Sequence, residues 1–107
     1  MEDRDRSSFA DRAVEVTSSA LAAREGELSR FGIRYDLERH EQRESVEVAV
    51  YFYSGREVVD VLEFFVIRNG APSVELPELD VWVHDSLADV LARAGHRKSA
   101  GQPHRGS

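Results

Sequence analysis

The chain contains no cysteine, which excludes disulfide bonds, thiolate metal sites and cysteine nucleophiles together. Its longest apolar runs fall far short of the ~20 residues of a membrane-spanning helix, and no apolar signal segment follows the first residues, Met-Glu-Asp-Arg. Its seven glycines are scattered singly, so there is no glycine-rich loop to cradle a phosphate. We therefore expect a cytoplasmic protein that enters no membrane and holds no cofactor.

Basic side chains are fewer than acidic ones. The 20 Asp and Glu residues outnumber the 14 Lys and Arg residues, for a formal charge of −6. Residues 95–107 contain Arg97, Lys98 and Arg105 and no acid, so residues 1–94 hold 11 bases against 20 acids, a charge of −9. Nucleic-acid-binding surfaces usually have the opposite sign, so we expect no nucleic-acid partner. An acidic body instead favours a basic protein partner through electrostatic attraction.

The length of 107 residues leaves room for one hydrophobic core. Apolar residues make up 41% of the chain and charged residues 32%, which is enough hydrophobicity for a folded domain. The polar first residues and the patternless end of the chain predict disorder at both termini. We expect a disordered N-terminus over residues 1–7, one domain over residues 8–95 and a disordered basic tail over residues 96–107.

The first element is predicted to be an amphipathic helix that begins at Ser8. Its apolar positions recur at i, i+4, i+7 and i+11, the period of a helix face, and are Phe9, Ala13, Val16 and Ala20. Gly26 is expected to end the helix as its C′ residue.

The middle of the chain has the two-residue period of β-strands. Apolar and polar residues alternate over residues 31–38 and again over residues 46–53. A third run, residues 57–68, also fits a helical period, but its valines and paired phenylalanines favour a strand. Ser54-Gly55 before this run and Asn69-Gly70 after it are typical of turns.

The last third of the chain is predicted to hold an extended segment and a helix. Pro72 and Pro77, with alternating apolar residues over residues 79–83, indicate an edge strand or an extended segment. A helix is expected from Asp85 or Ser86 until Gly95. The element order predicts an α+β fold in two layers, with an N-terminal helix, an antiparallel meander sheet of three to four strands and a C-terminal helix.

One face of this sheet is the strongest candidate for an interface. A two-residue loop at Ser54-Gly55 would pair Val50 with Val59 and Tyr51 with Val58, leaving apolar groups on both faces. The second face would gather Tyr51, Tyr53, Val58, Leu62, Phe64 and Val66. If both helices pack on the first face, the second is an exposed patch of the kind that marks partner surfaces. If a helix or the segment of residues 72–83 covers it instead, these residues belong to the core.

Polar residues offer few candidates for chemistry. Asp60 and Glu63 interrupt an apolar strand, but they are expected to point to opposite faces and so to form no catalytic pair. The histidines have no metal-binding spacing. His40 with Glu38 and Glu41 could bind a divalent ion, but we interpret these residues as a charged strand end. No serine lies in a Gly-x-Ser-x-Gly motif.

Two hypotheses of function follow. The first is a noncatalytic interaction domain that uses the apolar sheet face to form a homodimer or to hold a basic protein partner. The second is a domain that binds a small ligand, or an enzyme, with a pocket between sheet and helix. Polar groups of such a pocket would be Asp60, Glu63 and His84.

Overall fold

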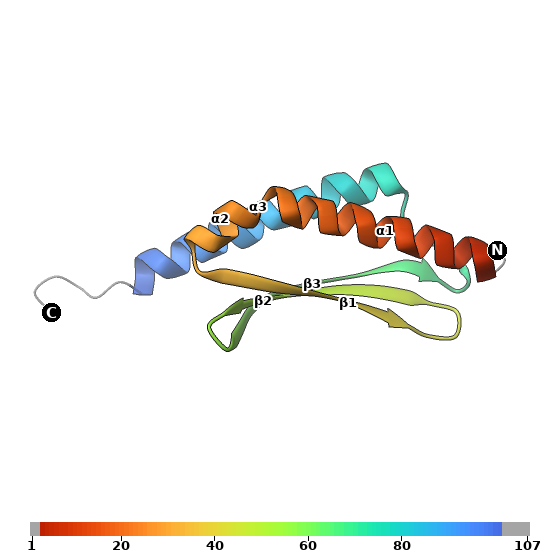
Figure 1. Ribbon diagram of the computed structural model, residues 1–107, viewed down its shortest axis with the longest axis horizontal. Helices are drawn as coiled ribbons and strands as arrows, with labels where there is room; N and C mark the ends of the chain where they lie inside the picture. Colours follow the sequence, from red (N-terminus) through yellow and green to blue (C-terminus); the bar gives the residue numbers. More distant parts are fainter. Residues whose placement is uncertain (1–2, 102–107) are drawn as a thin grey trace, which may run out of the picture.

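The computed structural model describes residues 3–101, and the surroundings of side chains over residues 4–98. The elements are α1 (Asp3–Ala23), α2 (Glu25–Arg30), β1 (Ile33–Glu41), β2 (Val46–Ser54), β3 (Glu57–Arg68), β4 (Ala71–Pro72) and α3 (Leu76–Gly101) (Figure 1). The predicted α+β fold is confirmed. The sequence predicts disorder over residues 1–7 and 96–107. Of these, residues 1–2 and 102–107 lie outside the described residues, and residues 3–7 and 96–101 are helical.

The protein has two layers. The four strands form one antiparallel meander in the order β1-β2-β3-β4. Helices α1 and α3 pack against each other and lie together on one face of this sheet (Figure 1). Between residues 3 and 101, no helix or strand lies on the other face.

Helix α1 buries a narrow, small-residue stripe. Its fully or nearly fully buried positions are Phe9, Ala10, Ala13, Thr17, Ala20 and Leu21. Alanines in this stripe let the helix approach its neighbours closely, and the buried Thr17 hydroxyl donates a hydrogen bond to the Ala13 carbonyl over 2.8 Å. The helix begins at Asp3, before the predicted start at Ser8.

The predicted helix end at Gly26 is wrong, because Gly26 lies inside the short helix α2. Leu28 of α2 is fully buried and anchors this extra turn. The chain leaves α2 through Gly32, whose φ of 69° is in the left-handed region. Glycine is the residue that adopts this conformation without steric cost, so Gly32 fills the role predicted for Gly26.

Two tight turns join the strands of the meander. Ser54 pairs with Glu57, so the loop between β2 and β3 is Gly55-Arg56, one residue later than predicted. Gly55 at its first position has a φ of 63°, as a type II′ turn requires. Asn69 and Gly70, with φ of 53° and 77°, make the type I′ turn between β3 and β4.

The predicted register of β2 and β3 is wrong, and the error reverses the faces of β3. Val50 pairs with Leu62 rather than Val59, and Tyr51 pairs with Val61 rather than Val58. Because the loop lies one residue later, the pairing partner on β3 shifts by two residues, and this even shift keeps each side chain on its predicted face. A β-bulge between the pairs Tyr53–Val58 and Phe52–Asp60 shifts the pairing by one further residue. Since side chains alternate with period two, an odd shift moves each of them to the opposite face.

The edge strand predicted over residues 79–83 is also wrong, because this segment is part of α3. Leu79 and Val83 are buried and four residues apart, and Leu87, Val90 and Ala94 continue the same helix face. Pro77 lies in the first turn of the helix, where its missing N–H costs nothing. The alternation of Leu79, Val81 and Val83 imitates a strand, but Val81 points outward.

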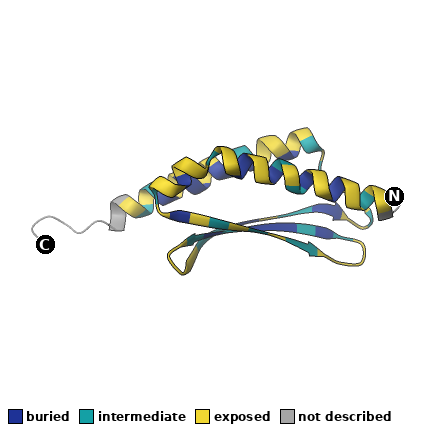
Figure 2. Ribbon diagram, viewed as in Figure 1, coloured by how far each residue is buried: buried dark blue, intermediate teal, exposed yellow. Residues whose placement is uncertain are grey.

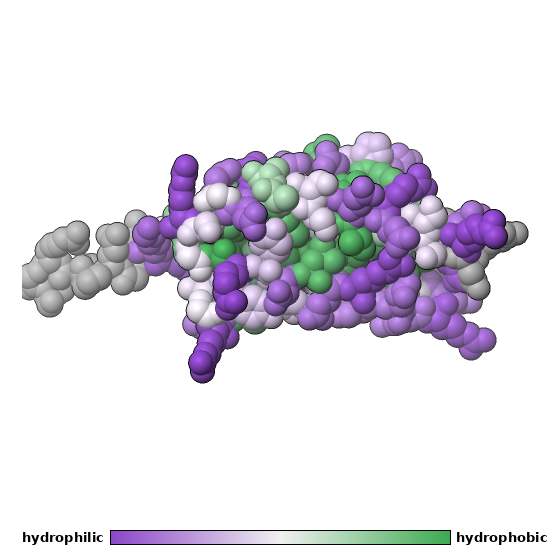
Figure 3. Space-filling view, in the orientation of Figure 1, coloured by the Kyte–Doolittle hydropathy of each residue, from purple (hydrophilic) through white to green (hydrophobic). Residues whose placement is uncertain are grey.

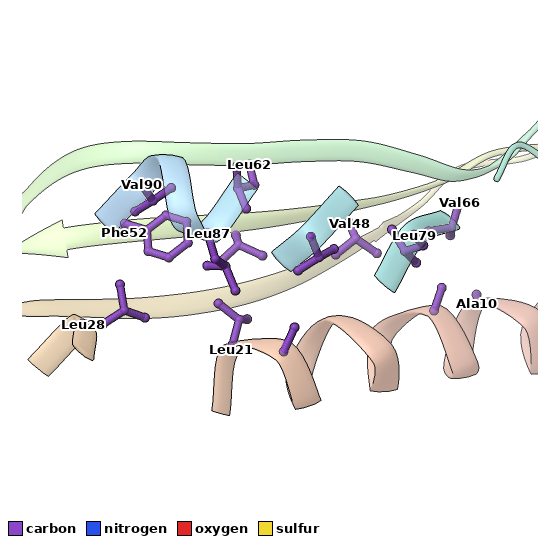
Figure 4. Close-up of a cluster of buried hydrophobic side chains, with 14 of the residues drawn as sticks. Ala10, Leu21, Leu28, Val48, Phe52, Leu62, Val66, Leu79, Leu87 and Val90 are labelled. Atoms are coloured by element: carbon purple, nitrogen blue, oxygen red, sulfur yellow. The ribbon is translucent and has the colours of Figure 1, made fainter. Parts of the chain in front are cut away.

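The hydrophobic core lies between the helix layer and the sheet. Buried residues line the inner sides of both layers (Figure 2). Phe52, Leu62 and Val66 point from the sheet towards Leu79, Leu87 and Val90 of α3 and towards α1 (Figure 4). Full burial of one such side chain contributes about 1.5–3 kcal/mol. Hydrophobic side chains are visible from the side between the layers, whereas charged ones cover the ends (Figure 3).

Neither long helix resembles a membrane span, since no helix within the described range is long and apolar enough to cross a bilayer.

Candidate functional site

The sheet face opposite the helices is the candidate site, and we call it the open sheet face. Its side chains come from alternate positions of the three long strands. They are Arg34, Asp36, Glu38 and His40 on β1; Glu47, Ala49, Tyr51 and Tyr53 on β2; and Val58, Val61, Glu63 and Phe65 on β3. The site is a broad surface built on rigid strands.

Only half of the predicted interface residues lie on the open sheet face. Tyr51, Tyr53 and Val58 do, and the Val58 side chain is 46% exposed. Leu62, Phe64 and Val66 lie on the helix side instead. Leu62 and Val66 are buried in the core, and Phe64 packs against it (Figure 4). This correction follows from the bulge near Val59, which turns the rest of β3 over.

The sequence pattern does not predict Val61 and Phe65 on the open sheet face. They lie there in place of Leu62, Phe64 and Val66. Val61 lies opposite Tyr51, and Phe65 lies opposite Glu47. The bulge that brings them there has no clear sequence signal, because Val58 and Val59 suit either phase of a strand. The open sheet face therefore has five large apolar residues where six were predicted, and three of the five are aromatic.

Two arginines show how the rings on this face receive cations. The guanidinium of Arg34 is 6.0 Å from the centre of the Tyr53 ring and donates to the Gly55 carbonyl over 2.6 Å. The guanidinium of Arg68 lies 4.4 Å from the centre of the Phe65 ring. Such cation–π contacts are attractive because the ring face carries partial negative charge. Tyr51 lies between these two positions, and no arginine of the described residues lies over its ring.

Carboxylates surround Tyr51. Asp36 is its neighbour on β1, and Glu38 and Glu63 flank Ala49, the next open-face position on β2. Loss of hydration, followed by the negative charges of Glu38, Glu63 and Glu47, raises the pKa of the Tyr51 hydroxyl above its usual value. The middle of the open sheet face therefore has a negative potential that disfavours a further anion and favours a cation.

His40 bridges two of these carboxylates. Its Nε2 lies 2.8 Å from Glu38 Oε1, and its Nδ1 lies 3.4 Å from Glu47 Oε1. The hydrogen bond to Glu38 and then that to Glu47 raise the pKa of His40. Glu41, the other residue considered for a metal site, pairs instead with Arg39. Within the described part of the chain, no group of three or more side chains could hold a metal ion.

The three residues proposed for a ligand pocket do not come together. Asp60 faces the helix layer, where its Oδ2 accepts a hydrogen bond from Arg93 Nε over 2.7 Å and its Oδ1 accepts one from the Val61 N–H. Glu63 lies on the open sheet face. His84 is nine residues before Arg93 on α3, with its Nε2 3.6 Å from Asp80. A hollow of about 390 Å³ between sheet and α3 is lined by none of them.

Comparison with protein-family models, with curated proteins and with solved structures finds no match for this chain. The proposed function is therefore based on the arrangement of residues on the open sheet face.

Proposed function

We propose that this protein is a noncatalytic binding domain whose open sheet face holds a cationic segment of another protein. One observation carries the proposal: aromatic rings and four carboxylates share the face that the helices leave uncovered. The carboxylates are Asp36, Glu38, Glu47 and Glu63. An arginine or lysine side chain laid across Tyr51 would gain a cation–π contact and a nearby carboxylate together.

A second copy of the chain fits this face less well than a basic partner. Two open sheet faces packed together would bring eight carboxylates into one interface, against two copies each of Arg34, Arg68 and His40. Like charges in a desolvated interface cost several kcal/mol. The charge of −9 over residues 1–94 acts in the same direction at longer range, because it attracts cationic proteins to the molecule.

The apolar residues supply the rest of the interface. Tyr53, Val58 and Val61 lie together at one end of the face and Phe65 at the other, with Glu38 and Glu63 between them. Interfaces commonly combine such apolar anchors, often aromatic, with polar groups that set orientation. A partner segment with alternating basic and apolar residues would match this pattern.

Titration with a short synthetic peptide of alternating arginine and leucine tests this function. We expect backbone amide signals of β2 and β3 to shift in the NMR spectrum of the labelled protein. Tyr51→Ala should raise the Kd about tenfold, the range of one desolvated cation–π contact. Glu63→Gln should raise it less, because three carboxylates remain.

Glu15→Gln is the matched control, since Glu15 is an exposed carboxylate on α1 in the other layer. It removes one negative charge, as Glu63→Gln does, but leaves the open sheet face intact. Equal affinities of the Glu15→Gln and Glu63→Gln variants, together with an unchanged Kd for Tyr51→Ala, would reduce the binding to nonspecific attraction and refute the assignment.

A further inference from the structure

Helix α3 exposes two large apolar side chains on its outer side. Val81 is 60% exposed and Trp82 is 42% exposed. The Trp82 ring packs edge-to-face on Phe64, with ring centres 5.2 Å apart, so the indole is held at the surface. With Pro77, these residues line an apolar hollow of about 470 Å³ whose other lining residues are Glu78 and Asp85. Held tryptophans of this kind are frequent binding hot spots.

A second hollow lies on the same side of α3, nearer its C-terminus. It measures about 380 Å³ and is lined by Ala92, Arg93, His96 and Arg97. Both hollows lie along one stripe of the helix surface, whose residues follow one another at alternating intervals of four and three. The stripe is Glu78, Trp82, Asp85, Asp89, Ala92 and His96. We call it the outer stripe of α3.

The charge changes sign along the outer stripe. Glu78 and Asp85 make its first half acidic and Asp89 lies near its middle, whereas Arg93 and Arg97 supply basic groups beside its second half. Arg93 is held in place by its hydrogen bond to Asp60. A surface with an acidic and a basic half complements itself when two copies meet around a two-fold axis. The antiparallel direction matches opposite charges, and the parallel direction opposes equal ones.

We infer that α3 pairs antiparallel with α3 of a second copy, so that the helix layers form a homodimer interface. An axis near Asp89 would bring the two Asp89 carboxylates together between the Arg93 side chains of both copies, and it would place Asp85 opposite Arg93 of the second copy. It would also place Trp82 against His96 of the second copy, at the hollow beside Ala92. Ala88 and Ala92 are small enough to let the helices approach closely. The two sheets then lie on the outside of the dimer.

This dimer does not depend on the proposed function, because it leaves both open sheet faces free. The two surfaces lie on opposite layers of the molecule, and each presents one exposed valine, Val58 on the sheet and Val81 on α3. The same substitution at these two positions therefore separates the two proposals.

Sedimentation equilibrium over a concentration series, on the wild type and on Val81→Arg and Val58→Arg variants, provides the test. We expect the wild type to dimerise and Val81→Arg, which faces Arg97 of the second copy, to raise the dimer Kd at least about tenfold. Val58→Arg should dimerise like the wild type and lose affinity for the cationic arginine–leucine peptide. A wild type that stays monomeric up to about 1 mM, the limit of weak specific association, overturns the dimer whatever the peptide does. A dimer lost in Val58→Arg but kept in Val81→Arg overturns it too.

Cysteine cross-linking tests the direction of the helices and remains informative if Val81→Arg fails to fold. The chain has no cysteine, so each introduced thiol reports one position. On oxidation, Asp89→Cys should cross-link with its own copy, since residue 89 lies near the axis. Val81→Cys should cross-link when mixed with Arg97→Cys but not by itself. Self-cross-linking of Val81→Cys as efficient as that of Asp89→Cys would indicate a parallel or random contact and overturn the antiparallel pair.

Discussion

His40 is the residue whose protonation has the clearest structural consequence. It lies between the carboxylates of Glu38 and Glu47, and the protonated imidazolium can donate hydrogen bonds to both. These hydrogen bonds raise the pKa of His40 in the folded protein. In the unfolded chain the carboxylates move away, and the pKa returns to an ordinary value of about 6.5. Folding is therefore linked to proton uptake at His40.

The sign of this linkage sets the pH dependence of stability. Because the folded pKa is the higher one, the stabilisation is fully present below the unfolded pKa and is lost as the pH rises through the folded pKa. His40→Gln should lower the unfolding temperature more at about pH 5.5 than at about pH 8.5, on either side of the titration. Thermal unfolding followed by circular dichroism measures the two differences.

The control places the same change in a Glu38→Gln, Glu47→Gln background. Without the carboxylates, substitution of His40 should have nearly equal effects at both pH values. A wild-type difference that is constant with pH, or larger at high pH, would contradict the assigned direction of the pKa change.

At the scale of the elements, two glycines have roles that differ from those that the sequence pattern suggests. Gly26 lies within helix α2, and a Cβ atom added there would meet nothing within 4 Å. Gly32 connects α2 to β1 with a φ of 69°. Glycine weakens a helix interior because the unfolded chain loses more conformational freedom there, but it is favourable where φ is positive. The same substitution should therefore act in opposite directions at the two positions.

Gly26→Ala should raise the free energy of unfolding by about 0.4–1 kcal/mol, the usual gain at a permissive helix position. Gly32→Ala should lower it by about 1–2 kcal/mol, the cost of placing an L-residue in the left-handed region. Urea unfolding of both variants measures the two changes. If Gly26→Ala destabilised the protein and Gly32→Ala did not, the helix would end at Gly26, as the sequence pattern indicates.

At the scale of the whole molecule, the excess of acidic residues favours long-range attraction of cations over ion pairs within the protein. Most ion pairs between described residues have at least one exposed partner, such as Glu27 in its pair with Arg24, and contribute little to stability. The surplus of acids remains uncompensated over the domain. A field of this kind acts on the rate of encounter with a cationic partner, over a range set by the Debye length.

Binding of the arginine–leucine peptide should therefore depend on salt mainly through the association rate. Raising the ionic strength from about 0.01 M to about 1 M shortens the Debye length from about 30 Å to about 3 Å and should slow association at least about tenfold. The dissociation rate should change less, because the aromatic contacts are not screened. Stopped-flow fluorescence of a labelled peptide measures both rates. Salt sensitivity confined to dissociation would show that long-range attraction has no part in the encounter.

The types and order of the main elements follow from the sequence alone. Strand β3 runs over the predicted residues 57–68, and the alternating pattern of residues 46–53 is nearly the whole of β2. These segments are predictable because the period of apolar residues directly reflects which side chains must leave water. The charge of the body is likewise a property of the sequence, and the proposal of a basic partner is based on it.

Tertiary structure decided which side chains share a surface. The bulge near Val59 depends on how β3 packs on β2 and under α3, and it moves Leu62, Phe64 and Val66 into the core while Val61 and Phe65 join the open sheet face. Residues 79–83 suit a strand by local pattern, but burial of Leu79 and Val83 on one side makes them helical and exposes Val81 and Trp82. Register and helix face are set by contacts between elements, and local periodicity contains no information about those contacts.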